Sequence, residues 1–255
     1  VYDLWGTELT PTKSDAYPIK TYADFTDQVS GEMKDPLAAM LENFSRIGPG
    51  EQVWYQVILT PTDQKEAQER AKQEIEKIKG ESKSKDPSLL AQIFALPVEI
   101  LEGIIGIFLP MGEKKKDEKK KDGPPKITLL SPGEKLVLEY IERKTSKIGF
   151  MCKMRVIYLA KKEAMSKPRV VTPFLGSIRQ FNTFNMQSLR PDSKKIGMNN
   201  DWWFFKAERN DARKTRLVRA FRDRSDGVGL NAFFLSVEEL ATLWHFPILT
   251  QVKAP

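Results

Sequence analysis

Apolar positions recur along the chain with two periods, and the change of period marks the expected secondary structure. From Glu51 to Thr60 apolar side chains stand on both faces of an alternating run, which is typical of a strand in the centre of a sheet. The run from Phe150 to Ala160 has the same pattern. Residues 1–30 are turn-rich and weakly patterned, and they predict only a short edge strand at 17–22.

Apolar residues three and four positions apart predict helices at 36–47, 64–79 and 131–147. Asp35 and Ser131 are the expected N-caps of the first and third helices, and each is followed by a proline at the first helical position. One further helix is expected at 175–185, with inward apolar side chains at Leu175, Ile178, Phe181 and Phe184.

These elements predict an α+β fold in which helices pack on one face of a mixed sheet. A ferredoxin-like arrangement is the most economical version. We expect residues 1–80 to form the first half of this domain and residues 131–190 the second half. Residues 81–130 are then an insertion that holds an apolar helix and a lysine-rich loop, and 191–255 hold a basic segment and a C-terminal helix.

The insertion contains the most apolar stretch of the chain, at 87–111, followed by the lysine-rich run GEKKKDEKKKDGPPK. Glu99 and Glu102 interrupt the stretch, and a carboxylate at mid-bilayer costs about 2.5–3.5 kcal/mol. The pattern therefore favours a helix lying in an anionic membrane interface or in a partner's groove over a spanning helix. The alternative is a helix packed on its own domain. The candidate contact residues are Ile93, Phe94, Leu101, Ile104, Ile105 and Phe108.

A net charge of +7 points to polyanionic partners such as nucleic acid or an anionic membrane. Between Lys206 and Arg224 eight basic residues accompany three acidic ones, and the aromatic run DWWFF stands just before them. Arginines beside aromatic rings are typical of single-strand nucleic-acid binding. A solvated helix face with the aromatics in the core explains the same pattern. The candidate residues are Arg213, Arg216, Arg219, Arg222 and Trp202.

The chain has one cysteine and one histidine, which excludes an intrachain disulfide and a zinc site of several His and Cys ligands. Cys152 is most simply a small core residue of its strand. No metal or organic cofactor is expected. The first residues have neither the basic start nor the apolar core of a signal peptide, and because the chain opens on Val1 we expect a fragment or a processed product.

Residues 233–247, FFLSVEELATLWHFP, combine a short apolar run, a capped helix and a proline stop. Ser236 and Glu239 have the spacing of a capping box. Val237, Leu240, Ala241 and Trp244 are expected on one helical face, with Leu240 and Trp244 packed either on this domain or on a following one. The His245 side chain is expected to meet the last helical carbonyls. We interpret the segment as a joint to another domain, formed by Glu239, Leu240, Trp244, His245 and Phe246.

Segments 36–62, 131–150, 157–165, 175–182 and 235–247 resemble, in this order, the region preceding the motor domain in conjugative-transfer, type IV secretion ATPases of the HerA/TraC-like class. The segment EELATLWHFP carries the most distinctive part of the resemblance. The resemblance implies a cytoplasmic accessory domain at the inner face of the membrane. Its implied partners are a downstream ATPase domain of the same polypeptide, further copies in a hexamer, secretion-channel proteins, DNA and anionic lipid.

The chain departs from that class because it contains no G-x-x-x-x-G-K-[ST] phosphate loop. The glycine pairs at Gly48 and Gly50, and at Gly227 and Gly229, lack the lysine and the hydroxyl residue of such a loop. We therefore expect this chain to be no enzyme by itself, although the full-length protein is expected to hydrolyse ATP. A single-stranded nucleic-acid-binding module and a membrane-interface protein are the alternative interpretations.

Overall fold

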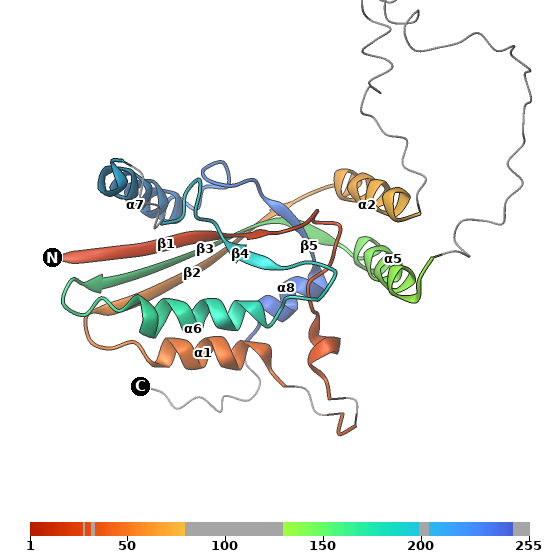
Figure 1. The fold of residues 1–255 in the computed structure, drawn as a ribbon, viewed down its shortest axis with the longest axis horizontal. Helices are drawn as coiled ribbons and strands as arrows, with labels where there is room; N and C mark the ends of the chain where they lie inside the picture. The colour runs from red at the N-terminus through yellow and green to blue at the C-terminus, as the bar shows by residue number, and fades with distance from the viewer. Residues whose placement is uncertain (28, 32–33, 80–129, 199–203, 247–255) are drawn as a thin grey trace, which may run out of the picture.

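A long strand, β3 (Gly149–Lys161), organises the sheet of this protein in a computed structural model (Figure 1). The structure describes residues 1–27, 29–31, 34–79, 130–198 and 204–246. Strand β2 (Glu51–Pro61) pairs along one side of β3. On the other side β1 (Tyr2–Pro11) and the short β5 (Phe233–Ser236) pair with successive parts of β3, and β4 (Leu189–Pro191) pairs with the end of β1.

The strand order is β2-β3-β1-β4, with β5 added beside β3, and all these pairings are antiparallel. Helix α1 (Pro36–Ser45) connects β1 to β2, and α6 (Lys167–Arg179) connects β3 to β4. Each connection passes one intervening strand, which gives the two split β-α-β units of a ferredoxin-like arrangement. The α+β class is confirmed, whereas the expected mixed sheet is antiparallel in every described pairing.

One face of the sheet packs on α1 and α6, which lie side by side beneath it in Figure 1. Alternate side chains of β3 point into this layer, because successive residues of a strand face opposite ways. Burying each large apolar side chain stabilises the fold by about 1.5–3 kcal/mol. The buried cluster includes Leu37, Met40, Met154, Val156, Phe174 and Ile178. The Asp35 carboxylate caps α1 by accepting the Leu37 N–H at 2.7 Å, as the sequence predicted.

Helix α7 (Lys206–Arg222) covers the opposite face of the sheet, so the expectation that the helices pack on one face is wrong. Leu217 of α7 is buried against Leu4 and Ile157. A Cβ atom at Gly6 would lie 2.3 Å from the Leu217 side chain, so only glycine allows α7 to approach β1 this closely. The apolar residues of α7 are few, which is why its basic sequence did not predict a packed helix.

Helices α2 (Lys65–Ile78) and α5 (Pro132–Thr145) pack on each other at the tip of the β2–β3 hairpin (Figure 1). Ala71 and Ile141 meet Ala16 in a small buried cluster there. Residues 80–129, which contain nearly all of the predicted insertion, lie outside the described residues. The membrane or partner candidates therefore lie outside them as well: Ile93, Phe94, Leu101, Ile104, Ile105 and Phe108.

Three expectations about individual elements are corrected. Strand β2 lies at the edge of the sheet, not at its centre. Residues 17–21 form no strand. The N-terminal strand is β1, which the sequence did not predict because polar residues interrupt its apolar alternation. Helix α6 begins at Lys167 and ends at Arg179, so Phe184 lies beyond it and is exposed.

Candidate functional site

The predicted joint is the passage from β5 into helix α8 (Val237–Leu243). Ser236 and Glu239 form the capping box that their spacing predicts. The Ser236 backbone N–H donates to Glu239 Oε2 at 2.8 Å, and the Ser236 hydroxyl accepts the Glu239 N–H at 3.4 Å. The strand and the helix are thus connected without a loop.

Glu239 does more than cap the helix, because its side chain is fully buried beside Lys144 of α5. Lys144 Nζ lies 3.0 Å from Glu239 Oε2 and also donates to the Tyr17 carbonyl at 3.3 Å. Glu239 Oε1 accepts the Ile19 backbone N–H at 2.9 Å. This buried ion pair therefore connects α8, α5 and the extended segment 17–19.

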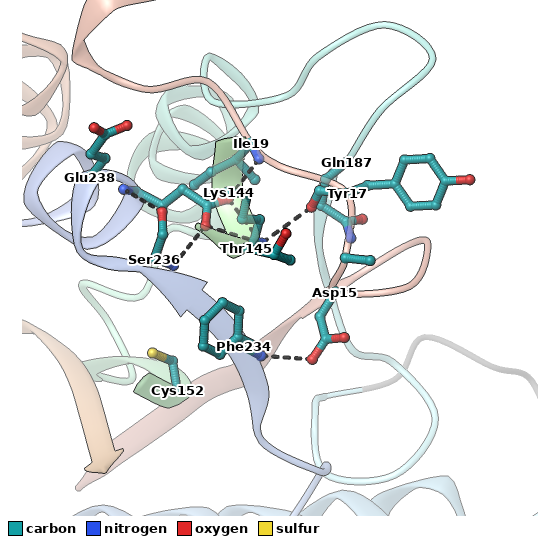
Figure 2. Close-up of polar contacts among 12 residues, drawn as sticks. Asp15, Tyr17, Ile19, Lys144, Thr145, Cys152, Gln187, Phe234, Ser236 and Glu238 are labelled. Carbon is teal, nitrogen blue, oxygen red and sulfur yellow. Dashed lines mark hydrogen bonds and ion pairs between the residues drawn. The ribbon is translucent and has the colours of Figure 1, made fainter. Parts of the chain in front are cut away.

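Asp15, just before this segment, binds two further elements, β5 and α2. Its Oδ2 accepts the Phe234 N–H of β5 at 2.8 Å (Figure 2). Both carboxylate oxygens also accept from the Arg70 guanidinium of α2, at 2.8 and 3.0 Å. Bidentate contacts of this kind are strong and directional. Residues 15–19 thus contact α2, α5, β5 and α8, and they hold these elements together.

The apolar face expected on α8 packs only in part on this domain. The buried residues of α8 are Glu239, Thr242 and Leu243, and Leu240 is only partly buried against the core. Trp244 remains 52% exposed, with its ring 6.3 Å from the Tyr55 ring, and Phe246 is 89% exposed. The joint therefore buries the ion-paired Glu239 together with Leu243 and leaves the apolar side chains of Trp244 and Phe246 exposed.

His245 holds the end of α8 against the start of α1. Its Nδ1 lies 2.8 Å from the Ala241 carbonyl, which confirms the predicted contact with the last helical carbonyls, and its Nε2 lies 3.0 Å from Asp35 Oδ1. Both partners accept hydrogen bonds, so the ring donates to both only as the imidazolium. The sequence predicted the first contact and not the second.

The four candidate arginines on α7 differ in what their side chains contact. Arg213 donates to the carbonyls of Ser193, Lys194 and Gly197, so it holds a loop of its own domain. Arg222 pairs with the neighbouring Asp223 at 2.9 Å. Arg216 and Arg219 are exposed and line a surface hollow of about 800 Å³. Trp202 lies outside the described residues.

A second buried ion pair, between Glu8 and Arg155, was missed by the sequence reasoning. Arg155 Nε donates to Glu8 Oε1 at 2.8 Å, and both side chains are buried. Nearby, Lys153 Nζ donates to the Val228 carbonyl, and burial lowers the pKa of Lys153. The available signal was the presence of two basic residues, Lys153 and Arg155, on one face of an otherwise apolar strand.

Cys152 is a buried core residue of β3 where this strand pairs with β5, as its strand position predicted (Figure 2). Burial raises the pKa of its thiol to about 12. At neutral pH this thiol is almost fully protonated, and the thiolate is the reactive form. A structural role is therefore favoured over a reactive one.

Within the described ranges, no helix is long and apolar enough to cross a membrane. The same residues contain no group of three or more His, Cys, Asp or Glu side chains placed to hold a metal ion. In comparisons with known proteins, no curated protein and no solved structure matches the chain. A family model described as a domain of unknown function, DUF8128, matches residues 3–254, and the chain belongs to this family.

Proposed function

We propose that this chain is a non-catalytic docking domain that precedes the motor domain of a conjugative-transfer, type IV secretion-like ATPase. The proposal is supported by the resemblance of its segments to that class, above all 235–247. In this role the domain helps to assemble the motor and to couple it to a secretion channel at the cytoplasmic face of the membrane. Its partners are the downstream ATPase domain of the same polypeptide, further copies in a hexamer, and channel proteins.

The observation that carries the proposal is the two-sided construction of α8. Its inner side is fixed by the buried Glu239–Lys144 pair. Exposed apolar side chains stand at its first residue, Val237, and just after its end, at Trp244 and Phe246. The Val237 N–H donates to the carbonyl of the exposed Ile148. Exposed apolar side chains that gather on one element mark an interaction site. A rigid base with an apolar outer side is suited to dock a following domain.

The first test is the coding sequence downstream of residue 255. A phosphate-loop motif in the same reading frame is expected, and a stop codon directly after Pro255 would overturn the proposal. The second test uses the full-length polypeptide with Trp244 and Phe246 both replaced by serine. Its hexamer assembly, measured by light scattering, should weaken at least about 30-fold, because buried aromatic anchors dominate interface energies.

The matched control is Leu136→Ser on α5, which removes an apolar side chain of comparable exposure away from the joint. This control should assemble like the wild type. Equal assembly of the Trp244/Phe246 variant and the wild type would exclude docking through the outer side of α8.

A second candidate function, single-stranded nucleic-acid binding, is favoured by the hollow beside Arg216 and Arg219. Replacing both arginines by glutamine should lower single-strand affinity and reduce its salt dependence, because fewer counterions are released. Arg222→Gln is the matched control, since Arg222 is already paired with Asp223. No measurable binding of the wild type at low salt would dispose of this function.

A further inference from the structure

Strand β2 has the sequence of a central strand and the position of an edge strand. Its eleven residues carry apolar side chains on both faces, with Val53, Tyr55 and Val57 on one and Trp54 and Ile58 on the other. It pairs with β3 along one side only. Among the described residues, the backbone groups that point away from β3 are bonded only at the start of the strand, where the Glu51 N–H donates to the Gly48 carbonyl at 3.1 Å. An unpaired edge of this kind is a template for another strand.

The opposite side of the sheet is closed by the chain itself. The outer strand there, β4, has only three residues. Beyond it the following loop bonds to β1 through the Asp192 N–H to the Glu8 carbonyl, at 2.8 Å, and the Met198 N–H to the Gly6 carbonyl, at 3.0 Å. Short edge strands and covering loops prevent unwanted pairing. Within the part of the chain that the structure describes, one edge of the sheet is thus covered and the other is left open.

Strand β2 also lacks the features that usually protect an edge. It contains no lysine or arginine, its pairing with β3 runs without a bulge, and its proline, Pro61, is the last residue. Its single acidic residue, Glu51, is buried and bound by Tyr158 and Arg169. The open edge therefore presents no charge on a chain whose net charge is +7.

Apolar surface accompanies the open edge. Leu59 is 47% exposed near the end of the strand. A hollow of about 260 Å³ opens between the strand and α8, lined by Tyr55, Gln56, Val57 and Trp244. A strand added at this edge would cover Leu59 and could place a side chain in the hollow. The edge therefore offers both backbone hydrogen bonds and apolar contacts, the two components of strand addition.

We propose that β2 pairs antiparallel with β2 of a second copy of this chain across a two-fold axis. Two chains of the same net charge repel each other least where neither carries basic side chains, and β2 is such a place. With the axis at Gln56, Val53 lies opposite Leu59 of the second copy, and Trp54 lies opposite Ile58. Such cross-strand apolar pairs stabilise a sheet, and the two sheets join into one in which β2 is central. This inference does not depend on the proposed function.

The test measures the mass of the 255-residue chain by sedimentation velocity over a concentration series. The wild type should pass from the 29.2 kDa monomer to a dimer as its concentration rises. Leu59→Lys and Gln52→Lys each place a charge at an exposed position of the edge. Each should raise the dimer dissociation constant on the order of 100-fold, because the two-fold axis buries the new charge twice.

The matched control is Leu136→Lys on α5, at a leucine that is 48% exposed and distant in sequence from the edge. It should dimerise like the wild type. Circular dichroism establishes that all three variants are folded. Amide exchange should show concentration-dependent protection in β2 of the wild type and of the control, and none in the two edge variants.

The proposal is overturned by a wild type that stays monomeric at about 100 µM, well above a micromolar dissociation constant. A dimer that persists in both edge variants also overturns it, because the interface then lies elsewhere. Equal weakening by Leu136→Lys would show a general charge effect and would overturn it as well.

Discussion

The two buried ion pairs have the same charges but different tasks. Glu8 and Arg155 connect two strands of the sheet and lie beneath α7, whereas Lys144 and Glu239 connect two helices at the joint. Arg155 spreads its donors over Glu8 Oε1, Gln56 Oε1 and the carbonyls of Ala220, Ser225 and Val228. Lys144 donates to Glu239 and the Tyr17 carbonyl, and its ammonium lies 5.9 Å from the centre of the Phe234 ring.

The difference follows from the chemistry of the two cations. A guanidinium presents a planar fork of five N–H donors, so it can bind several carbonyls at once. An ammonium is a compact point charge with three donors. The arginine site therefore locks α7 and the loop after it into the body of the domain, and the lysine site fastens a local junction. We infer that the first pair contributes to global stability and the second to the attachment of the joint.

The largest expected effect is that of Arg155→Leu. The substitution leaves the Glu8 carboxylate buried without its cation and removes one donor from each of three carbonyls. The Val228 and Ala220 carbonyls keep bonds from Lys153 Nζ and the Ser225 N–H. Breaking a buried pair in this way should lower the free energy of unfolding by about 3–5 kcal/mol. Urea denaturation measures the loss. Arg216→Leu, an exposed arginine on α7, is the control and should change stability by less than about 0.5 kcal/mol.

Glu239→Gln should have a smaller effect, about 2–3 kcal/mol. Lys144 then keeps a buried, unpaired charge, but the glutamine carbonyl can still accept the Ile19 N–H. The adjacent Glu238→Gln is the control, because Glu238 pairs with Arg143 and Lys147, which are about half exposed. Exposed pairs contribute about 0–1 kcal/mol. Equal urea midpoints for the two variants would show that the buried Glu239 pair contributes no more to the free energy of unfolding than the exposed Glu238 pairs.

The double variant Lys144→Met with Glu239→Gln measures the interaction between the two side chains separately from their contacts with other groups. Once Glu239 is replaced, removing the unpaired ammonium relieves its burial cost, so the double variant should be less destabilised than the sum of the single variants. A coupling of about 1–2 kcal/mol is expected for groups in direct contact. Additive losses in urea denaturation would mean that the two side chains act independently.

The contrast between the pairs also shows what the sequence could predict. Capping boxes are local, so those at Ser131 and Ser236 followed from residues three positions apart and are confirmed. Glu239 was therefore placed correctly at the start of its helix. Its partner lies 95 residues away and that of Arg155 lies 147 residues away. Separations of this size are set by topology, which no local pattern contains.

Contacts between distant parts of the chain also decide which residues are buried, so burial was harder to predict than the helix caps. A seven-residue helix has too few turns for apolar spacing to fix which side packs on its own domain, so the sequence left open whether Leu240 and Trp244 pack on this domain or on a following one. In the structure Leu240 is partly buried and Trp244 is about half exposed. The actual inward face is chosen by Glu239, because a carboxylate bound by Lys144 and by backbone N–H groups is stable inside. The two-sided apolar pattern of β2 predicted a central strand, and its place at the edge is the observation on which the proposed self-pairing rests.

The smallest expected effect concerns the local opening of the joint, reported by Cys152. Strand β5 pairs beside this residue, with Phe233 opposite Cys152, and both side chains belong to the same buried cluster. Burial raises the pKa of the thiol to about 12, whereas an unfolded thiol has a pKa of about 8.5. A raised thiol pKa lowers stability only as pH rises above the unfolded value. Labelling at pH 7.5 therefore leaves stability unchanged and reports only molecules in which Cys152 is exposed.

In Arg155→Leu the thiol should be labelled through global unfolding, because β5 and α8 keep all their own contacts. The opening free energy from labelling should then equal the unfolding free energy from urea. In Glu239→Gln the joint should open by itself, so labelling should be about 10-fold faster than global unfolding predicts, or about 1.4 kcal/mol. If both variants are labelled only through global unfolding, the joint is part of the same cooperative unit as α7, and the division of tasks between the two ion pairs is wrong.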